Sequence, residues 1–168
     1  SNAVVPVLEI GSGRGELQTV FREAGVLSYA LELDPAMAQC CRNGGFDVRV
    51  EDGIEHLLHA ADASLGGIIA IQVIEHLTRE QLTRLLRLGL QKVVPGGRVV
   101  FETINTESLS ALCHNYFRDP SHVWPLHPET MRYLMDLAGY VNLEVKKLSA
   151  YPAQAMLQEV SFSSAVTP

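Results

Sequence analysis

The chain has 168 residues, of which 47% are hydrophobic and 19% charged, and this size and composition are typical of one globular domain with a substantial core. Its net charge of −6 and its pI near 5.5 argue against a broad basic surface, so no nucleic-acid partner is favoured. The apolar run at 68–74 is too short to span a bilayer, and three cysteines without metal-type spacing indicate reduced thiols, so we expect a cytoplasmic protein with no membrane span.

Strand and helix patterns alternate along the first hundred residues. Such repeated units predict an α/β fold with a parallel sheet covered on both faces. Thr78 and Gln81 have the spacing of a capping box at the start of the last of these helices, whose leucines at 82, 85 and 86 mark one buried face. The predicted strands are 4–10, 27–33, 46–50, 66–74 and 98–103, and the predicted helices are 13–24, 34–43, 53–61 and 79–94.

The pattern breaks at residues 104–127, a long stretch without a period that contains His114, His122 and His127. A loop of this length within a domain is usually functional or disordered, and its prolines and aromatic residue favour function. Beyond it, Pro128 and Gly139 delimit a helix at 128–138, His127 is expected beside the N-terminus of that helix, and His114 is expected at the surface. Two final strands, at 142–148 and 157–166, are expected to pair antiparallel.

The glycine loop at 9–15 follows the first strand and predicts a ligand site. A side chain at Gly11 or Gly13 would keep a ligand from the backbone amides at the start of the next helix. A dinucleotide fingerprint requires its third glycine at 16, where this chain has Glu16, and the Gly-Lys-Ser/Thr ending of a phosphate loop is missing. The carboxylate of Glu9 would repel a pyrophosphate and suits a ligand with a positive charge.

This loop resembles motif I of the class I S-adenosylmethionine-dependent methyltransferases, Asp/Glu-x-Gly-x-Gly-x-Gly, and four further landmarks follow in order. Glu32 ends the second strand where that family places the acid that binds both ribose hydroxyls. Asp52 stands where a side chain meets the adenine amino group, although it would also fill a helix N-cap well. "IQVIEHL" resembles motif IV, and "LQKVVPGGRVVFET" resembles the helix and strand after it. The implied cofactor-binding residues are Glu9, Gly11, Ser12, Gly13, Gly15, Glu32, Leu33, Asp52, Gly53 and Gln72.

The resemblance also implies a cofactor and a topology. The cofactor is S-adenosyl-L-methionine, with S-adenosyl-L-homocysteine as the product. The fold is a Rossmann-like doubly wound, mostly parallel seven-stranded sheet with an antiparallel last strand and the strand order 3-2-1-4-5-7-6. Residues 1–3 (SNA) are typical of an expression-tag remnant, and we expect residues 4–168 to be a single domain, excised from a longer protein with a fused neighbour domain.

The acceptor side is expected after the fourth and fifth predicted strands, because ligands of such sheets bind at the carboxyl ends of the strands. If the acceptor is a hydroxyl, a base must remove its proton, and histidine suits neutral pH. Residues 101–140 resemble a bacterial methyltransferase subgroup of glycan and polysaccharide biosynthesis, with Asp119, His122 and Pro125 at matching places; Ile104, Thr106 and Ser121 depart from its pattern. We therefore expect a small-molecule or glycan acceptor, with His122 as base or acceptor anchor and His76 as the second catalytic candidate.

Other functions remain open. His122 has no part in the chemistry if it only caps its loop or packs it against the following helix. RNA 3′-terminal 2′-O-methyltransferases bind a divalent metal with two glutamates and two histidines, and this chain resembles them in Glu75, His76 and His122 but has Gln72 in place of the first glutamate. Three ligands could still hold a metal with open positions, but because the set is incomplete no metal is expected, and the acidic balance of the chain argues against an RNA substrate. A non-catalytic domain that binds the cofactor is a third possibility, and the glycine spacing opposes a nicotinamide dehydrogenase.

Overall fold

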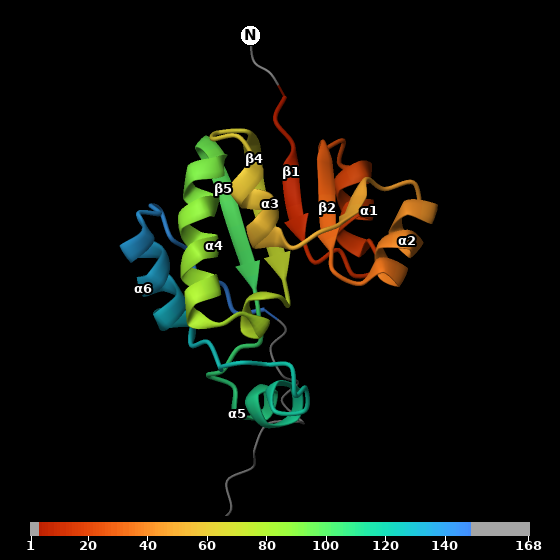
Figure 1. The fold of residues 1–168 in the computed structure, drawn as a ribbon. Helices are drawn as coiled ribbons and strands as arrows, with labels where there is room; N and C mark the ends of the chain where they lie inside the picture. The colour runs from red at the N-terminus through yellow and green to blue at the C-terminus, as the bar shows by residue number, and fades with distance from the viewer. Residues whose placement is uncertain (1–3, 149–168) are drawn as a thin grey trace, which may run out of the picture.

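The computed structural model describes residues 4–148 of the chain. Five strands form one parallel sheet in the order β3-β2-β1-β4-β5 (Figure 1), which confirms the predicted α/β class and the predicted order of the first five strands. The strands are β1 (Val7–Ile10), β2 (Ser28–Glu32), β3 (Val48–Val50), β4 (Leu65–Ile71) and β5 (Val93–Glu102).

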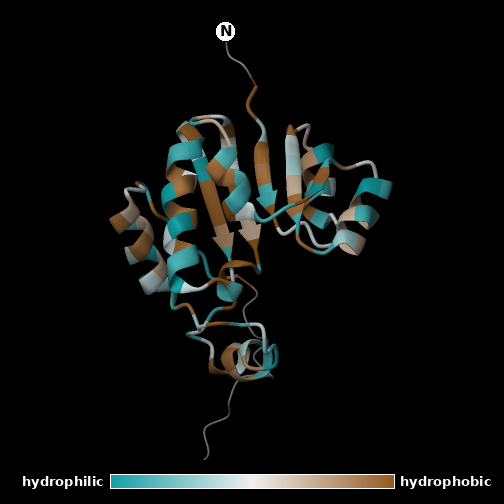
Figure 2. Ribbon diagram, in the orientation of Figure 1, coloured by the Kyte–Doolittle hydropathy of each residue, from teal (hydrophilic) through white to brown (hydrophobic). Residues whose placement is uncertain are grey.

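Helices cover both faces of the sheet. Leu31 belongs to an apolar cluster with Leu57 and Leu82 from helices on one face, whereas its neighbour Ala30 packs with Ala38 from a helix on the other. This division follows from the strand geometry, since successive side chains of a strand point to opposite faces. Figure 2 shows the apolar strands at the centre and hydrophilic residues along the outer side of the helices. The longer helices are α1 (Glu16–Glu23), α2 (Pro35–Asn43), α3 (Gly53–His59), α4 (Arg79–Lys92) and α6 (Pro128–Ala138).

Helix α4 has the N-terminus that the sequence predicts. Thr78 Oγ1 accepts a hydrogen bond of 3.2 Å from the amide of Gln81, and Gln81 Oε1 accepts one of 2.8 Å from the amide of Thr78, which completes the capping box. The leucines at 82, 85 and 86 are buried, as predicted. Tyr140 Oη donates a hydrogen bond of 2.9 Å to the Leu86 carbonyl and so joins the segment after α6 to α4; burial raises the pKa of Tyr140 to about 12.

Several predicted boundaries are wrong, and the backbone gives the reasons. Helix α1 begins at Glu16 rather than at 13, because Gly13 and Gly15 adopt positive φ angles of 52° and 85°. Strand β4 ends at Ile71 rather than at 74, because Gln72 turns the chain with a φ of 55° into the short 3-10 helix η1 (Ile74–His76). Strand β5 begins at 93, where the chain leaves α4, and its pairing with β4 shifts register near its start.

The end of the chain departs further from the prediction. Residues 104–127 contain the short helices α5 (Leu109–Ala111) and η2 (Leu112–Tyr116), which lie beyond the carboxyl ends of the strands (Figure 1). As described, residues 142–148 form no strand: Val145 and Leu148 are exposed, and no described strand lies beside them to form a ladder, so the strand expected there stays a prediction. The strand expected at 157–166 lies outside the described residues, so the sheet is confirmed for five of its seven expected strands.

Within residues 4–148, no helix has the length and apolar character that crossing a membrane requires.

Candidate functional site

The glycine loop between β1 and α1 adopts a backbone that favours glycine at three positions. Gly11, Gly13 and Gly15 have φ angles of 81°, 52° and 85°. A Cβ at Gly11 would lie 2.7 Å from Val73 Cγ2, whereas a Cβ at Gly13 would meet no described atom within 4 Å. The backbone of Gly13 is therefore open to a ligand, and a side chain there would occupy the space into which a ligand must come.

Glu32 stands beside this loop, at the end of β2. Its Oε2 accepts a hydrogen bond of 2.9 Å from the Gly13 amide, and its Oε1 accepts one of 3.0 Å from the Asp34 amide. Two backbone donors thus fix the carboxylate, while lone pairs on both oxygens remain for a further partner. The next residue, Leu33, is 67% exposed and provides apolar surface at the same edge of the sheet.

Glu9 lies in the interior below the loop and is only 3% exposed. Its Oε2 accepts a hydrogen bond of 2.8 Å from Gln18 Nε2. Burial raises the pKa of Glu9 to about 7, the bond from Gln18 opposes this rise, and the negative charges of Glu16 and Glu32 add to it. Ser12 is also buried, with its Oγ 3.7 Å from Cys41 Sγ.

Gln18 was missed in the sequence: it is 2% exposed, and its Oε1 also accepts a hydrogen bond of 3.0 Å from Ser28 Oγ. A polar residue at a core-facing position of the helix after the loop was the available signal.

Asp52 is the N-cap of α3. Its Oδ1 accepts hydrogen bonds of 2.9 Å and 3.0 Å from the amides of Ile54 and Glu55, and its Oδ2 accepts none from the described residues. Gly53 is buried, and a Cβ there would lie 2.7 Å from Ile10 Cγ2, so glycine lets α3 approach β1 closely. One carboxylate oxygen of Asp52 therefore caps the helix and the other is available to a ligand.

Gln72 is exposed at the end of β4, and its amide donates a hydrogen bond of 2.8 Å to the Glu102 carbonyl. Its φ of 55° is unusual for a residue other than glycine. Strained backbone of this kind is concentrated at functional sites.

The two predicted catalytic histidines come together although His76 follows β4 and His122 lies in the loop after β5. The ring centroids of His76 and His122 are 4.7 Å apart, and His122 also stacks on Tyr116 at 4.8 Å. His122 Nδ1 lies 2.7 Å from the Tyr116 carbonyl, so this nitrogen is the protonated donor in the neutral ring and Nε2 carries the lone pair. The contact with Tyr116 was not predicted from the sequence, where only the aromatic character of this residue and its place in the aperiodic loop pointed to it.

Glu75 adjoins these histidines and is fully buried. Neither of its carboxylate oxygens has a hydrogen-bond partner among the described residues. Its backbone carbonyl accepts a hydrogen bond of 2.9 Å from the amide of Val123, which holds the loop of His122 against η1.

Asp119 shapes the turn before His122. Its Oδ1 accepts hydrogen bonds of 2.9 Å from the amide and 2.6 Å from the hydroxyl of Ser121, and these bonds lower the pKa of Asp119. Ser121 Oγ in turn lies 3.0 Å from His76 Nδ1. His114 is exposed, as predicted, and His127 is itself the N-cap of α6, where its Nδ1 accepts a hydrogen bond of 3.2 Å from the Glu129 amide.

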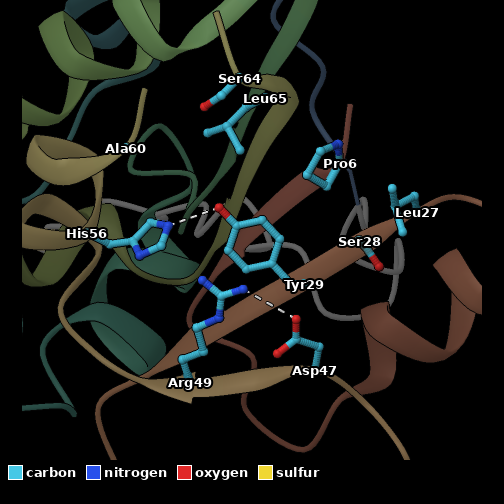
Figure 3. Close-up of a pocket in the computed structure, with 10 residues that line it drawn as sticks. All are labelled: Pro6, Leu27, Ser28, Tyr29, Asp47, Arg49, His56, Ala60, Ser64 and Leu65. Carbon is cyan, nitrogen blue, oxygen red and sulfur yellow. Dashed lines mark hydrogen bonds and ion pairs between the residues drawn. The ribbon is translucent and has the colours of Figure 1, made fainter. Parts of the chain in front are cut away.

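A separate hollow of about 460 Å³ lies at the opposite ends of the strands, near the starts of β2 and β4 (Figure 3). Tyr29 Oη lies 2.9 Å from His56 Nε2 there, and the guanidinium of Arg49 lies over the Tyr29 ring, 4.5 Å from its centroid. Because ligands of open parallel sheets bind at the carboxyl ends of the strands, this hollow is not the place for the cofactor.

These features define a Rossmann-like protein that binds a nucleoside-containing cofactor. They are the parallel sheet in this strand order, the glycine loop after β1 and the fixed carboxylate at the end of β2. The family model described as a methyltransferase domain matches residues 2–145, and the chain belongs to that family. It is an S-adenosylmethionine-dependent methyltransferase.

Solved structures agree with this assignment. An S-adenosylmethionine-dependent methyltransferase from Archaeoglobus fulgidus is 30% identical, with a TM-score of 0.87, and the match covers 96% of this chain and 72% of that one. A phosphoethanolamine N-methyltransferase of Haemonchus contortus, solved with S-adenosylhomocysteine, is 17% identical with a TM-score of 0.72, over 88% of this chain and 36% of that one.

A methyltransferase solved in complex with the Haloferax volcanii Trm112 activator is also 17% identical, with a TM-score of 0.69, over 81% of this chain and 61% of that one. At this identity these last two relatives show the shared fold alone, and the chain spans less than two thirds of either. No match was found among curated proteins.

Proposed function

We propose that this methyltransferase transfers the methyl group to a hydroxyl of a sugar, a glycan or another small molecule. The observation that carries the proposal is the pairing of His76, which follows β4, with His122, which lies in the loop after β5; their rings are 4.7 Å apart. A hydroxyl must lose its proton as it is methylated, and an imidazole is the side chain best suited to accept a proton or hold the hydroxyl near neutral pH.

The residues of the glycine loop fit the cofactor. The open backbone of Gly13 suits the close approach of the methionine part, and the fixed carboxylate of Glu32 suits two ribose hydroxyls. Asp52 Oδ2 is available to an adenine amino group, and Leu33 provides apolar surface for the base. S-adenosyl-L-methionine supplies a methyl group on a positively charged sulfur, which is open to direct displacement. Gly11, Ser12, Gly15, Gly53 and Gln72 complete the proposed binding set, with Glu9 below it.

The protein contributes to the reaction mainly by positioning the methyl donor and the acceptor hydroxyl relative to each other. Holding two reacting atoms in line can contribute up to about 7–11 kcal/mol to catalysis. His122 is suited to this because Tyr116 orients its ring, and its side chain is only 7% exposed. We assign His122 as the base or the anchor of the acceptor hydroxyl. We assign His76 as the second residue that contacts this hydroxyl.

A sugar or other small acceptor is favoured over RNA by the charge of the chain. A net charge of −6 opposes binding to a polyanion, since affinity for nucleic acids depends on neutralising phosphates with lysine and arginine. The similarity of the loop around Asp119, His122 and Pro125 to glycan methyltransferases supports the same choice.

Turnover measurements test the proposal. Methyl transfer from S-adenosyl-L-methionine to sugar and glycan acceptors is expected, with none to small RNAs. His122→Ala should lower turnover by at least about 100-fold, in the range of general acid–base effects, and leave cofactor binding in calorimetry unchanged. The matched control is His114→Ala, an exposed histidine of the same loop, which should retain full turnover. Full turnover in His122→Ala, or methylation of RNA alone, would refute the proposal.

A further inference from the structure

We propose that Glu75, His76 and His122 form a binding site for one divalent first-row transition cation, such as Mn²⁺ or Zn²⁺. The inference rests on the proposed function and deepens it: the two histidines hold the acceptor hydroxyl through the cation rather than by direct contact. From the sequence alone no metal is expected, because glutamine stands at 72. The arrangement of the three remaining side chains leads to the opposite conclusion.

The strongest observation is the carboxylate of Glu75. It is 0% exposed, and neither oxygen has a hydrogen-bond partner among the described residues. Buried carboxylates in native proteins are paired, hydrogen-bonded or bound to a metal, because an isolated buried charge is strongly unfavourable. Within the described part of the chain, a cation is the partner that its surroundings are built to accept.

The two imidazoles stand where such a cation needs them. One nitrogen of each ring and one oxygen of Glu75 all lie within 4.8 Å of one another. Ligands of one cation, each about 2.1 Å from it, lie at most about 4.2 Å apart, so small side-chain rotations close the site.

Hydrogen bonds already orient both rings for this role. His122 Nδ1 lies 2.7 Å from the Tyr116 carbonyl, and His76 Nδ1 lies 3.0 Å from Ser121 Oγ. A metal-binding histidine characteristically donates its other ring N–H in this way, which leaves Nε2 for the metal. Asp119 adds negative potential at this place, since its Oδ2 lies 4.0 Å from His122 Nε2.

The donor set indicates which cations fit. Two imidazoles and one carboxylate suit Mn²⁺, Co²⁺ or Zn²⁺, whereas Mg²⁺ and Ca²⁺ prefer oxygen ligands alone. Three protein ligands leave coordination positions open for water or for an acceptor hydroxyl. The Oη of Tyr116 and the Nε1 of Trp124 are also buried without a partner in the described residues, and both are donors that an ordered water can satisfy.

Cation binding can be measured without any acceptor. The chain is treated with EDTA, desalted and titrated with MnCl₂ by electron paramagnetic resonance and with ZnCl₂ by calorimetry. We expect one saturable site per chain, at least tenfold weaker binding in Glu75→Gln and in His122→Ala, and unchanged binding in His114→Ala. MgCl₂ should compete weakly. The absence of a saturable site, or equal affinity in Glu75→Gln, would overturn the proposal.

Two further measurements separate this proposal from the proposed function. Calorimetry with S-adenosyl-L-homocysteine checks that each variant is folded, and His76→Ala replaces Glu75→Gln if the latter fails this check. Cofactor binding and turnover without Mn²⁺ binding would reject the cation site and leave the proposed function standing. Mn²⁺ binding without turnover on any sugar acceptor would reject the proposed function and leave the site. If both hold, EDTA should abolish turnover and Mn²⁺ restore it.

Discussion

The amide of Gly13 donates a hydrogen bond of 2.9 Å to Oε2 of Glu32, and this bond joins the glycine loop to the end of the neighbouring strand. The second oxygen of Glu32 is held by the Asp34 amide at 3.0 Å. The carboxylate is therefore in place before a ligand arrives, which reduces the entropy that binding must spend on ordering the side chain. One residue thus contributes both to the shape of the loop and to the proposed ribose contact.

Replacement of Glu32 separates these two contributions. Glu32→Ala should weaken S-adenosyl-L-methionine binding at least tenfold, because hydrogen bonds to a charged group are worth about 1.5–3 kcal/mol each. Glu32→Gln keeps one acceptor oxygen and should give an intermediate affinity. Calorimetry with S-adenosyl-L-methionine measures the effect, and urea unfolding reports the loss of the loop contact. Wild-type affinity in Glu32→Ala would remove this residue from the binding set.

The open backbone of Gly13 makes a second prediction, with a matched control in the same chain. Gly13 and Gly96 both have positive φ angles, 52° and 83°, and a Cβ at either would meet nothing within 4 Å. Alanine at either position should therefore cost about 1–2 kcal/mol of unfolding free energy from backbone strain alone. Only Gly13→Ala should also weaken cofactor binding, since Gly96 lies near the start of β5, away from the carboxyl ends of the strands where the glycine loop stands. Equal affinities in the two variants would show that no ligand approaches Gly13.

Local signals account for the parts of the fold that the sequence predicted well. The capping box of Thr78 and Gln81 and the buried leucines of α4 involve residues within a few positions of one another, so their spacing is visible in the sequence. The same holds for the glycine loop and for Glu32, which the order of strands and helices brings to one edge of the sheet.

Long-range contacts and backbone turns account for the parts that it did not predict. The apolar run at 68–74 continues past the end of β4, and hydropathy does not reveal that Gln72 reverses the sign of φ. Glu75 is buried, and the loop of His122 is held against it by the hydrogen bond from the Val123 amide to the Glu75 carbonyl. No periodic pattern in 104–127 encodes that contact, so the histidines could be named from the sequence but their environment could not.

Asp52 has two roles that substitution can distinguish. Its Oδ1 caps α3, whereas its Oδ2 is the proposed contact with the adenine amino group. Asp52→Ser keeps a good N-cap, so stability should change by less than about 0.5 kcal/mol, while cofactor affinity falls several-fold. Asp52→Ala should lose both, with about 1 kcal/mol of stability. Urea unfolding and calorimetry on the two variants measure these effects, and unchanged affinity in Asp52→Ser would leave Asp52 with the capping role alone.

The buried carboxyl of Glu9 makes stability depend on pH. Its pKa is about 7 in the folded chain, against an ordinary value of 4.5, so the folded state keeps a proton that the unfolded state has lost between these two pH values. Stability rises with pH where the unfolded state binds more protons, and here the folded state binds more. The contribution of Glu9 therefore falls as pH rises from about 4.5 to about 7, by at most about 3 kcal/mol.

Glu9→Gln isolates this effect, because its amide oxygen can still accept the hydrogen bond from Gln18 while carrying no charge. Urea unfolding at pH 4.5, 6 and 8 should show the variant gaining stability over the wild type as pH rises. Glu23→Gln, at the exposed end of α1, is the control and should follow the wild type at each pH. If the curves for Glu9→Gln and the wild type stay parallel, Glu9 titrates alike in the folded and unfolded chain, and its negative charge is available to a sulfonium at pH 6 and pH 8.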